Sequence, residues 1–589
     1  MTDLLEHLKQ RKVVQWSLAY VAFAFALLQG LDIVAQQFGW PDGVRRGTTI
    51  ALAVGFFVTL VLAWYHGERG AQRVNGTELL ILSLLLAIGG GVLWRVAPAS
   101  REAAPATGTN ASPVKTDAAI SSLSIDEKSI AVLPLANTSG DPDNEYFSDG
   151  LSEELISVLG KIPDLKTIGR SSSFHFKNSK EDSRTIGAQL GVVNLLEGSV
   201  RKQGDSVRIV VDLIRAANGQ QLWSETYERD LKDIFAIQSE IAAAVVEQLK
   251  LKLLGAPQRF LAAPATVNLA AYNALLQGQY FTRRFNEADQ QKALAYLEEA
   301  VRIDPDYALA HAYLSRVWRS LGAAFLVTPV EIDSAYVHAR ESAETALRLA
   351  PDLAEAHLAL GWVRVTPDID LPGAEVEFRR AAALAPHDAR TLQALGYLLG
   401  ALGDIDEADK MDQQAIDIDP FLVGAYLDRA RNQMARVRLD AAEATLRKIL
   451  ELQSDTSHVY TYLAIVDLQR GDAAAALRNA ALEPAGFWHD YGVTLAQQAQ
   501  GDPAAAEAAL GTFIAKYAHG GPYQVAIVYA FRKEPDRMFE WLDKAYAERD
   551  SGLTQLMVTP FLLDYRGDPR FAAFMRKLKI DPAVLARYP

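Results

Sequence analysis

The amino-acid sequence predicts a multidomain chain with three transmembrane helices, a small mixed α/β domain and an all-helical repeat superhelix. Three observations lead to this fold class: strongly apolar windows gather in the first hundred residues, strand and helix patterns alternate after them, and one short phrase recurs in the second half. A chain of 589 residues is too long for a single core, so about three or four domains are expected.

The composition narrows the classes of function. The net charge of −13 disfavours a nucleic-acid partner, because an anionic protein repels phosphate. The absence of cysteine excludes thiol catalysis, zinc–thiolate sites and disulfides. The ten histidines are scattered without an HxxxH pair, so a histidine metal site is not expected and no cofactor is predicted. The composition is also compatible with a homo-oligomer.

Three apolar stretches in residues 1–97 predict a membrane anchor. Val13–Ala35, Gly47–Tyr65 and Leu79–Val96 each have about the 20 residues that cross a bilayer. The first is too long for a signal peptide and lacks a cleavage site. The basic cluster at Lys9–Lys12 favours a cytoplasmic N-terminus, by a flank margin of five basic residues against four. The sequence therefore predicts an integral membrane protein whose domains after residue 97 are periplasmic.

A linker over residues 98–127 follows the anchor. It is rich in Ala, Pro, Ser and Thr without hydrophobic periodicity, so it cannot bury a core and is predicted to be a flexible tether.

Within the anchor, Asp32 lies near the outer end of the first span, where a carboxylate reaches interfacial water. A structural role for Asp32 is therefore favoured over a functional one.

Residues 128–256 predict a small mixed α/β domain. A strand over Ser129–Ala136 and a helix over Leu151–Ile162 open it, and crossovers followed by hairpins give an α/β sandwich. The other expected elements are a second strand that begins at Leu165, a short helix that ends at Gly191, three strands joined by turns at Gln203-Gly204-Asp205 and Asn218-Gly219, and a helix over Asp233–Leu254.

An acidic loop, Asp141, Asp143, Glu145 and Asp149, lies between the first strand and the first helix. Many metal and phosphate sites occupy that position, but a calcium loop starting at Asp141 would need glycine at its sixth place and glutamate at its twelfth, and has neither. With His175, the three aspartates are the best candidates for acid–base catalysis. Their spacing matches no chemical template, so no catalytic residue and no metal ion are predicted.

A structural interpretation explains the same loop. Ser148 or Asp149 can cap the helix, and Glu153 and Glu154 favour the positive end of its dipole. The loop is therefore predicted to be the entry of the first helix, with at most a role in docking.

The stretch SIAVLPLANTSGDPDNEYFSDGLSEELISVL, followed by GRSSSFHFK and GAQLGVVNLLEGSVRKQGDSVRIVVDLIRAANGQQLWSETYERDLKDIFAIQSEIA, resembles the TolB-like N-terminal domain. That family occurs in bacterial proteins beside tetratricopeptide arrays, often behind a winged-helix or class III adenylate cyclase domain and a membrane span. The resemblance implies a binding or assembly module without catalytic residues. A winged-helix or cyclase domain is not expected here, since only about twelve residues precede the first predicted span.

A repeat with the tetratricopeptide period fills the second half of the chain. Pro351, Pro386 and Pro420 are 35 and 34 residues apart in variants of one phrase, and Ser454 continues the register after another 34. About seven repeats are predicted over residues 268–520. Their helices are expected to cross at small residues: Gly278, Ala293, Ala300, Gly361, Ala374, Ala381, Gly396, Ala408 and Ala415.

Two segments depart from the period. Pro305 and Pro351 are 46 residues apart, so GAAFLVTPVEID is an insertion of about 12 residues in the second unit. Residues 521–589 predict a degenerate repeat and a C-terminal cap.

Stacked helix pairs form a superhelix whose concave face is lined by the first helix of each unit. The expected partner is an extended peptide or a helix of another protein. Aromatic and arginine side chains are typical anchors of such interfaces, and the alternative is that they pack between repeats. One facing position per unit gives the candidate partner-binding residues: Gln279, Arg316, Trp362, Tyr397 and Arg431.

Three classes of function are compared. The preferred one is a non-catalytic scaffold that is anchored in the bilayer and binds a protein or peptide partner. The alternative is a sensory or regulatory component of a cyclase-type or transcriptional pathway that works through a separate effector. An enzyme is the third class and is not expected, because only the acidic loop and His175 offer candidates.

Overall fold

The computed structural model describes residues 127–588, apart from 163, 250–265, 267, 285 and 324–328. All the described residues belong to one compact unit, Ala119–Pro589. The predicted spans, Asp32 and almost all of the linker lie outside the described residues. No helix in the described part of the chain has both the length and the apolar character needed to cross a bilayer.

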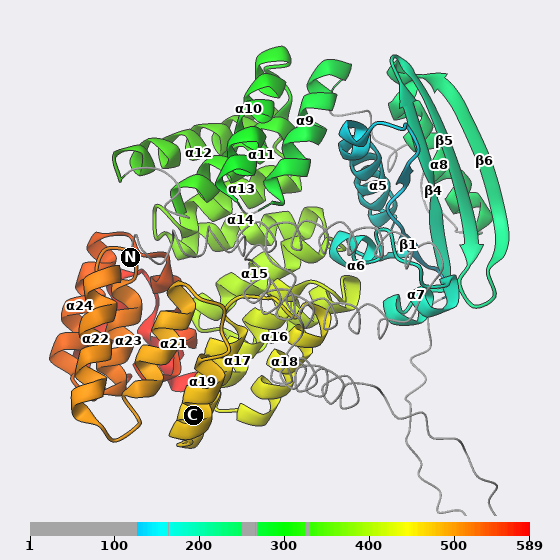
Figure 1. The fold of residues 1–589 in the computed structure, drawn as a ribbon. Helices are drawn as coiled ribbons and strands as arrows, with labels where there is room; N and C mark the ends of the chain where they lie inside the picture. Colours follow the sequence, from blue (N-terminus) through cyan, green and yellow to red (C-terminus); the bar gives the residue numbers. More distant parts are fainter. Residues whose placement is uncertain are drawn as a thin grey trace, which may run out of the picture. The chain divides into compact units, whose positions relative to one another are not determined.

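A mixed sheet, with strand order β3-β1-β4-β5-β6, forms the centre of the α/β domain (Figure 1). β1 is parallel to β3 and β4, whereas β4, β5 and β6 form antiparallel hairpins. Positive φ angles of 58° at Gly204 and 67° at Gly219 fit the two turns, as the hairpin prediction requires. The strands are β1 (Ser129–Val132), β2 (Ala136–Asn137, which pairs with β4), β3 (Lys166–Thr167), β4 (Asn194–Gln203), β5 (Ser206–Arg215) and β6 (Gln220–Asp230).

Both faces of β1 are buried, as expected of a parallel strand inside an α/β fold. Ile130 and Val132 pack with the helices on one face, and Ala131 packs on the other, because side chains alternate along a strand. The first face is covered by α5 (Glu145–Gly160) and α8 (Ile234–Gln248). The second face is covered mainly by α7 (Ser183–Leu190), with α6 (Arg170–His175) beside it.

The entry to the first helix differs from the prediction. A 3-10 helix, η1 (Pro142–Asn144), precedes α5, and Asp141 caps it by accepting a 3.0 Å hydrogen bond from the Asp143 backbone N–H. The helix α5 then begins at Glu145 rather than Leu151. Capping by Ser148 or Asp149 is therefore wrong, since both are buried inside the helix. Glu153 and Glu154 likewise lie in the third turn, beyond the strongest effect of the N-terminal dipole.

Three other boundaries shift. The predicted first strand breaks into β1 and β2, and the second strand is only two residues long before α6 takes over the Ser-rich segment. The final helix α8 ends at Gln248, and residues 250–265 are outside the described part.

Helix pairs follow one another from α9 to α24 (Figure 1). Each first helix contacts its own second helix, and from α9 to α17 each also contacts the next first helix, which places these first helices on the inside of the stack. We call the surface of α9, α11, α13, α15 and α17 the inner face. The pairs are α9 (Leu269–Thr282) with α10 (Glu287–Ile303), α11 (Ala308–Ala323) with α12 (Pro329–Leu349), α13 (Ala354–Val365) with α14 (Leu371–Leu384), α15 (Ala389–Leu402) with α16 (Ile405–Ile418), α17 (Val423–Ala435) with α18 (Leu439–Leu452), α19 (Val459–Arg470) with α20 (Ala473–Ala480), α21 (Phe487–Gln497) with α22 (Pro503–Tyr517), and α23 (Pro522–Phe531) with α24 (Pro535–Ala547).

The small residues lie where the helices cross, which confirms that prediction. A Cβ added at Gly361 would lie 2.3 Å from the Phe378 ring, and one at Gly396 would lie 2.4 Å from the Asp412 carboxylate. All six predicted alanines are fully buried. The insertion in the second unit spans the end of α11 and the start of α12, a helix of 21 residues.

The chain after α24 folds back onto earlier repeats. This C-terminal tail, residues 549–588, contains η4 (Ser551–Val558), α25 (Pro560–Leu563), α26 (Pro569–Lys577) and η5 (Pro582–Arg587). The helix η4 packs on both α15 and α17. The polar contacts that join the tail to earlier repeats include Arg549 with Asp333 (3.1 Å), Lys579 with Asp370 (2.9 Å), Arg587 with Asp404 (3.1 Å), and Arg436 with the carbonyl of Arg587 (3.0 Å).

Candidate functional site

Aromatic and arginine side chains form a continuous row along the inner face. The Trp362 and Tyr397 ring centroids are 5.4 Å apart. The guanidinium of Arg431 lies 5.6 Å from the Tyr397 ring centre, and that of Arg319 lies 5.2 Å from the Trp362 ring. The structure thus brings three of the five predicted residues together. It adds Arg319, which sequence reasoning missed by choosing one position per repeat, although it lies one turn after Arg316.

The two remaining candidates lie earlier on the inner face. Gln279, on α9, is only 5% exposed, so it packs within the repeats and offers little surface to a partner. Arg316, on α11, is partly exposed and lies close enough to Arg319 to lower the pKa of its neighbour. Arg316 therefore belongs to the row, whereas Gln279 is a buried residue of α9.

The tail covers the row at Tyr397 and Arg431. Tyr397 is hydrogen-bonded through its hydroxyl to Thr554 of η4. Arg431 is paired with Asp428, whose carboxylate also accepts a hydrogen bond from Gln393. Burial raises the pKa of Asp428, and the charge of Arg431 opposes that shift. The cavities left here have volumes of about 10 and 20 Å³, enough for about one water each, so this part of the inner face is filled.

A group of arginines lies at the other end of the row. We call Arg170, Arg283, Arg316, Arg319 and Arg390 the arginine cluster. Two acids pair with it: Glu153 of α5 accepts from Arg170 at 2.7 Å and also pairs with Arg283, and Asp388 lies 3.6 Å from Arg390. The α/β domain supplies Arg170 and Glu153, and the repeats supply the rest, so the site is shared between two domains.

The members of the cluster repel one another. Burial lowers the pKa of Arg283 to about 9 and that of Arg170 to about 10, and in both cases the positive charge of Arg390 lowers the pKa further. Burial and the charge of Arg316 lower the pKa of Arg319 to about 10. All of them stay protonated at neutral pH. The site is therefore a concentration of positive charge in a protein of net charge −13.

A loop of the repeats fixes the position of Arg170. The Asp419 carboxylate accepts hydrogen bonds from the backbone N–H groups of Ser171 (2.9 Å) and Ser172 (2.7 Å), so it caps α6 from the turn between α16 and α17. In the same turn, the Phe421 ring stacks on His175 with centroids 4.2 Å apart. These contacts hold the first turn of α6, where Arg170 lies, against the repeats.

Most residues of the acidic loop, and His175, make structural contacts. Asp141 caps η1, and His175 stacks on Phe421. Lys177 pairs with Asp149 and with Glu145, each at 2.6 Å, and burial raises the pKa of Asp149 against the effect of Lys177. Across the described residues, no group of three or more His, Cys, Asp or Glu side chains is placed to hold a metal ion.

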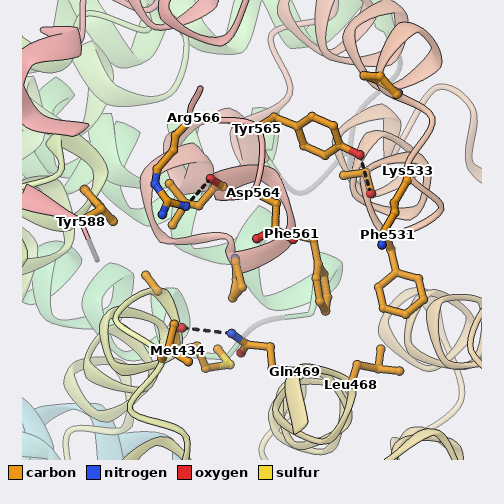
Figure 2. Close-up of a pocket in the computed structure, with 16 residues that line it drawn as sticks. Met434, Leu468, Gln469, Phe531, Lys533, Phe561, Asp564, Tyr565, Arg566 and Tyr588 are labelled. Atoms are coloured by element: carbon orange, nitrogen blue, oxygen red, sulfur yellow. Dashed lines mark hydrogen bonds between the residues drawn. The ribbon is translucent and has the colours of Figure 1, made fainter. Parts of the chain in front are cut away.

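A second hollow lies under the tail, at the carboxyl ends of α17, α19 and α23. Figure 2 shows its largely apolar lining, with Phe531 and Phe561 near Lys533, and with Gln469 donating a 3.2 Å hydrogen bond to the Met434 carbonyl. Its volume is about 760 Å³. Burial raises the pKa of Asp564 in the lining, and Arg566 and Lys533 oppose that shift. The mixed lining offers no preference for one ligand charge.

Residues 389–421, which are α15, α16 and the turn after them, match the family model of the tetratricopeptide repeat. The chain carries tetratricopeptide repeats. It therefore contains an interaction scaffold of this type, joined to a small mixed-sheet domain.

Curated proteins and solved structures are similar to parts of the chain. "Putative adenylate cyclase 3" of Rhizobium meliloti (strain 1021) is 35% identical over 244 residues, 40% of this chain and 40% of that protein. Protein O-mannosyl-transferase TMTC3 of Homo sapiens is 28% identical over 203 residues, 34% of this chain and 18% of that protein. The chain thus spans less than half of either relative. The type IV pilus biogenesis factor PilW is 20% identical, with a TM-score of 0.31, over 36% of this chain and 92% of PilW.

Proposed function

We propose that this chain is a non-catalytic, membrane-anchored scaffold that binds a protein or peptide partner on its inner face. The observation that carries the proposal is the row of Arg316, Arg319 and Trp362, which lies on the inner face before the part that the tail fills. Aromatic and arginine side chains in a concave, partly desolvated surface are the usual anchors of protein interfaces. In this proposal, Tyr397 and Arg431 stabilise the tail, and Arg316 and Trp362 contact the partner.

The anchor and the α/β domain complete the proposal. The three apolar stretches of residues 1–97 would hold the chain in a bacterial inner membrane, with the later domains in the periplasm. The α/β domain would act as a TolB-like assembly module, because α5 and α6 join it to the repeats and Arg170 reaches the same site. A protein partner is favoured over nucleic acid by the net charge of −13.

Capture of partners from membranes tests the proposal. The full chain and a Trp362→Ala variant are cross-linked in cells, and the captured proteins are compared, with Trp541→Ala on α24 as the control. We expect one or more proteins that bind the wild-type chain and the control but not Trp362→Ala. Equal capture by all three would refute a binding role for the inner face.

Reporter fusions after Arg73 and at the C-terminus test the topology, and a cytoplasmic C-terminus contradicts the periplasmic assignment.

A second candidate is a regulatory component of a cyclase-type signalling pathway. It is favoured by the relative named as an adenylate cyclase, which shares 35% identity over 40% of both chains. In this role the chain would control a separate effector. Deletion of the gene with measurement of cellular cyclic nucleotide separates the two: a change that Trp362→Ala reproduces supports regulation, and an unchanged level removes this candidate.

A further inference from the structure

The arginine cluster has more positive charge than its neighbours neutralise. Arg316 has no acidic partner among the residues that the structure describes. The Nε atom of Arg319 is buried and has no hydrogen-bond partner in the described part of the chain. Glu153 is shared between Arg170 and Arg283, so one carboxylate serves two guanidinium groups. Five cations thus meet two paired carboxylates.

The other acids nearby are engaged elsewhere or only act at longer range. Asp149 is bound by Lys177, and Asp419 is bound by the backbone of α6. Glu355 lies close enough to Arg390 to favour its charged form, but the two are not joined by an ion pair. The cluster therefore remains positive after every described acid around it has been counted.

Such an arrangement destabilises the unliganded protein. Burying a charged group without a partner is unfavourable, and like charges at short range add to that penalty. A ligand that carries negative charge removes both penalties at once, so the cluster should bind anions well. Arginine is also suited to carboxylates, because its planar group can donate two parallel hydrogen bonds to one of them.

The spread of the cluster indicates an extended ligand. Its five arginines come from four elements, α6, the end of α9, α11 and α15, and Trp362 continues the site along the inner face. One phosphate ion could contact only part of this surface. A peptide with several acidic side chains could contact all of it and place an apolar side chain near Trp362.

We propose that the arginine cluster binds an acidic segment of the partner protein, with glutamate or aspartate carboxylates paired to Arg316, Arg319 and Arg390. This inference rests on the proposed function, since it names the chemistry of the partner that the inner face would bind. Electrostatic attraction would also speed the encounter and make the affinity depend on salt.

The test uses the purified full chain and a fluorescein-labelled peptide of alternating glutamate and alanine, followed by fluorescence anisotropy at low ionic strength. The peptide in which glutamine replaces glutamate is the ligand control. The protein variant is R316Q/R319Q, and the matched control is R302Q/R447Q, which removes two exposed arginines from α10 and α18. R390Q gives a second variant at the rim of the cluster.

We expect the acidic peptide to bind the wild-type chain and R302Q/R447Q alike, and to bind R316Q/R319Q at least about tenfold more weakly. The peptide should also raise the melting temperature of the wild-type chain but not that of R316Q/R319Q. If that double variant does not fold, R390Q decides by the same anisotropy measurement, with weaker binding expected.

Three outcomes overturn the inference: equal binding of the glutamine peptide, equal binding by wild-type and R316Q/R319Q, or tighter binding of pyrophosphate or a single-stranded oligonucleotide than of the acidic peptide. The proposed function fails separately. A partner captured through Trp362 that has no acidic segment refutes this inference and leaves the scaffold role intact.

Discussion

The two ends of the inner-face row contain similar side chains, but the positive charge is neutralised at one end and not at the other. At the end near α17, Arg431 is paired with Asp428, and Tyr397 is bound to Thr554 of the tail. At the end near α11, Arg316 has no acidic partner among the described residues, and the guanidinium of Arg319 lies 5.2 Å from the Trp362 ring. At the first end, Asp428 and Thr554 of the same chain bind the arginine and the tyrosine. At the second end, the positive charge has too few carboxylates to neutralise it.

This difference shows why composition alone does not identify a binding residue. Sequence reasoning gave Arg316 and Arg431 the same role because both occupy the facing position of a first helix. The distinction comes from Asp428, one turn before Arg431, and from the tail, which is more than a hundred residues away in sequence. An arginine in a repeat is a structural residue where its charge is matched and a candidate anchor where it is not.

The largest expected change in stability comes from removing the ion pair between Asp428 and Arg431. Asp428→Ala leaves Arg431 buried without its carboxylate, so the free energy of unfolding should fall by about 3–5 kcal/mol. Chemical denaturation followed by circular dichroism measures it. The double variant Asp428→Ala with Arg431→Met removes both charges and should recover most of the loss. A double variant as unstable as the single one would show that the charge pair is not the reason.

A smaller effect should follow from separating the two domains that build the cluster. Asp419→Ala removes a carboxylate that accepts hydrogen bonds from Ser171 and Ser172, and should lower the free energy of unfolding by about 3 kcal/mol. Faster amide hydrogen exchange in residues 169–176 would locate the effect at α6. Exposed Asp455 provides the control, since Asp455→Ala should change neither measurement.

The buried carboxyl of Glu154 tests how much an unpaired charge costs, because its titration makes the stability depend on pH. Burial raises the pKa of this carboxyl from 4.5 to about 7, and Glu355 adds to that shift. The folded state therefore holds a proton that the unfolded state releases, so this group makes the protein less stable as pH rises from about 4.5 to 7, and the loss is complete above pH 7. Glu154→Gln should be more stable than wild type by about 2 kcal/mol at pH 8, with no difference at pH 4. Melting curves at both values check this, and an equal difference at both would contradict it.

The smallest expected change is an increase in the free energy of unfolding, whereas the change at Asp428 is a decrease. Arg316→Gln removes one repelling charge and should stabilise the unliganded protein by about 1 kcal/mol, with the gain shrinking as salt screens the repulsion. Differential scanning calorimetry at low and high salt measures it. Arg447→Gln, on the outer surface, should be close to neutral. Destabilisation by Arg316→Gln would mean that the cluster is already matched.

Local patterns predicted the repeats well. The period of 34 residues and the small residues at helix crossings depend on contacts within one unit, so they appear directly in the sequence. Gly361 illustrates this, because its missing side chain makes room for Phe378 of the next helix. The hairpin turns at Gly204 and Gly219 were predictable for the same reason, since a positive φ favours glycine.

Long-range contacts account for what the sequence did not predict. The helix α5 begins earlier than expected, and residues of its first turns are buried, Gly150 among them against Leu276 of α9. The arginine cluster gathers residues from positions 170 to 390, and no periodicity joins them. The covering of Tyr397 by Thr554 likewise joins residues 157 positions apart.

The tail has a consequence for the order in which the chain can form. Repeat arrays usually fold from nearest-neighbour contacts alone, so early units can form while later ones are still being made. Here Arg436 receives its tail partner, Arg587, only after 151 more residues have been synthesised, which takes about 8–30 s on a ribosome. Until the tail has been made, the surface of α15 and α17 on which η4 packs is uncovered. The newborn chain thus exposes a surface that the finished protein covers.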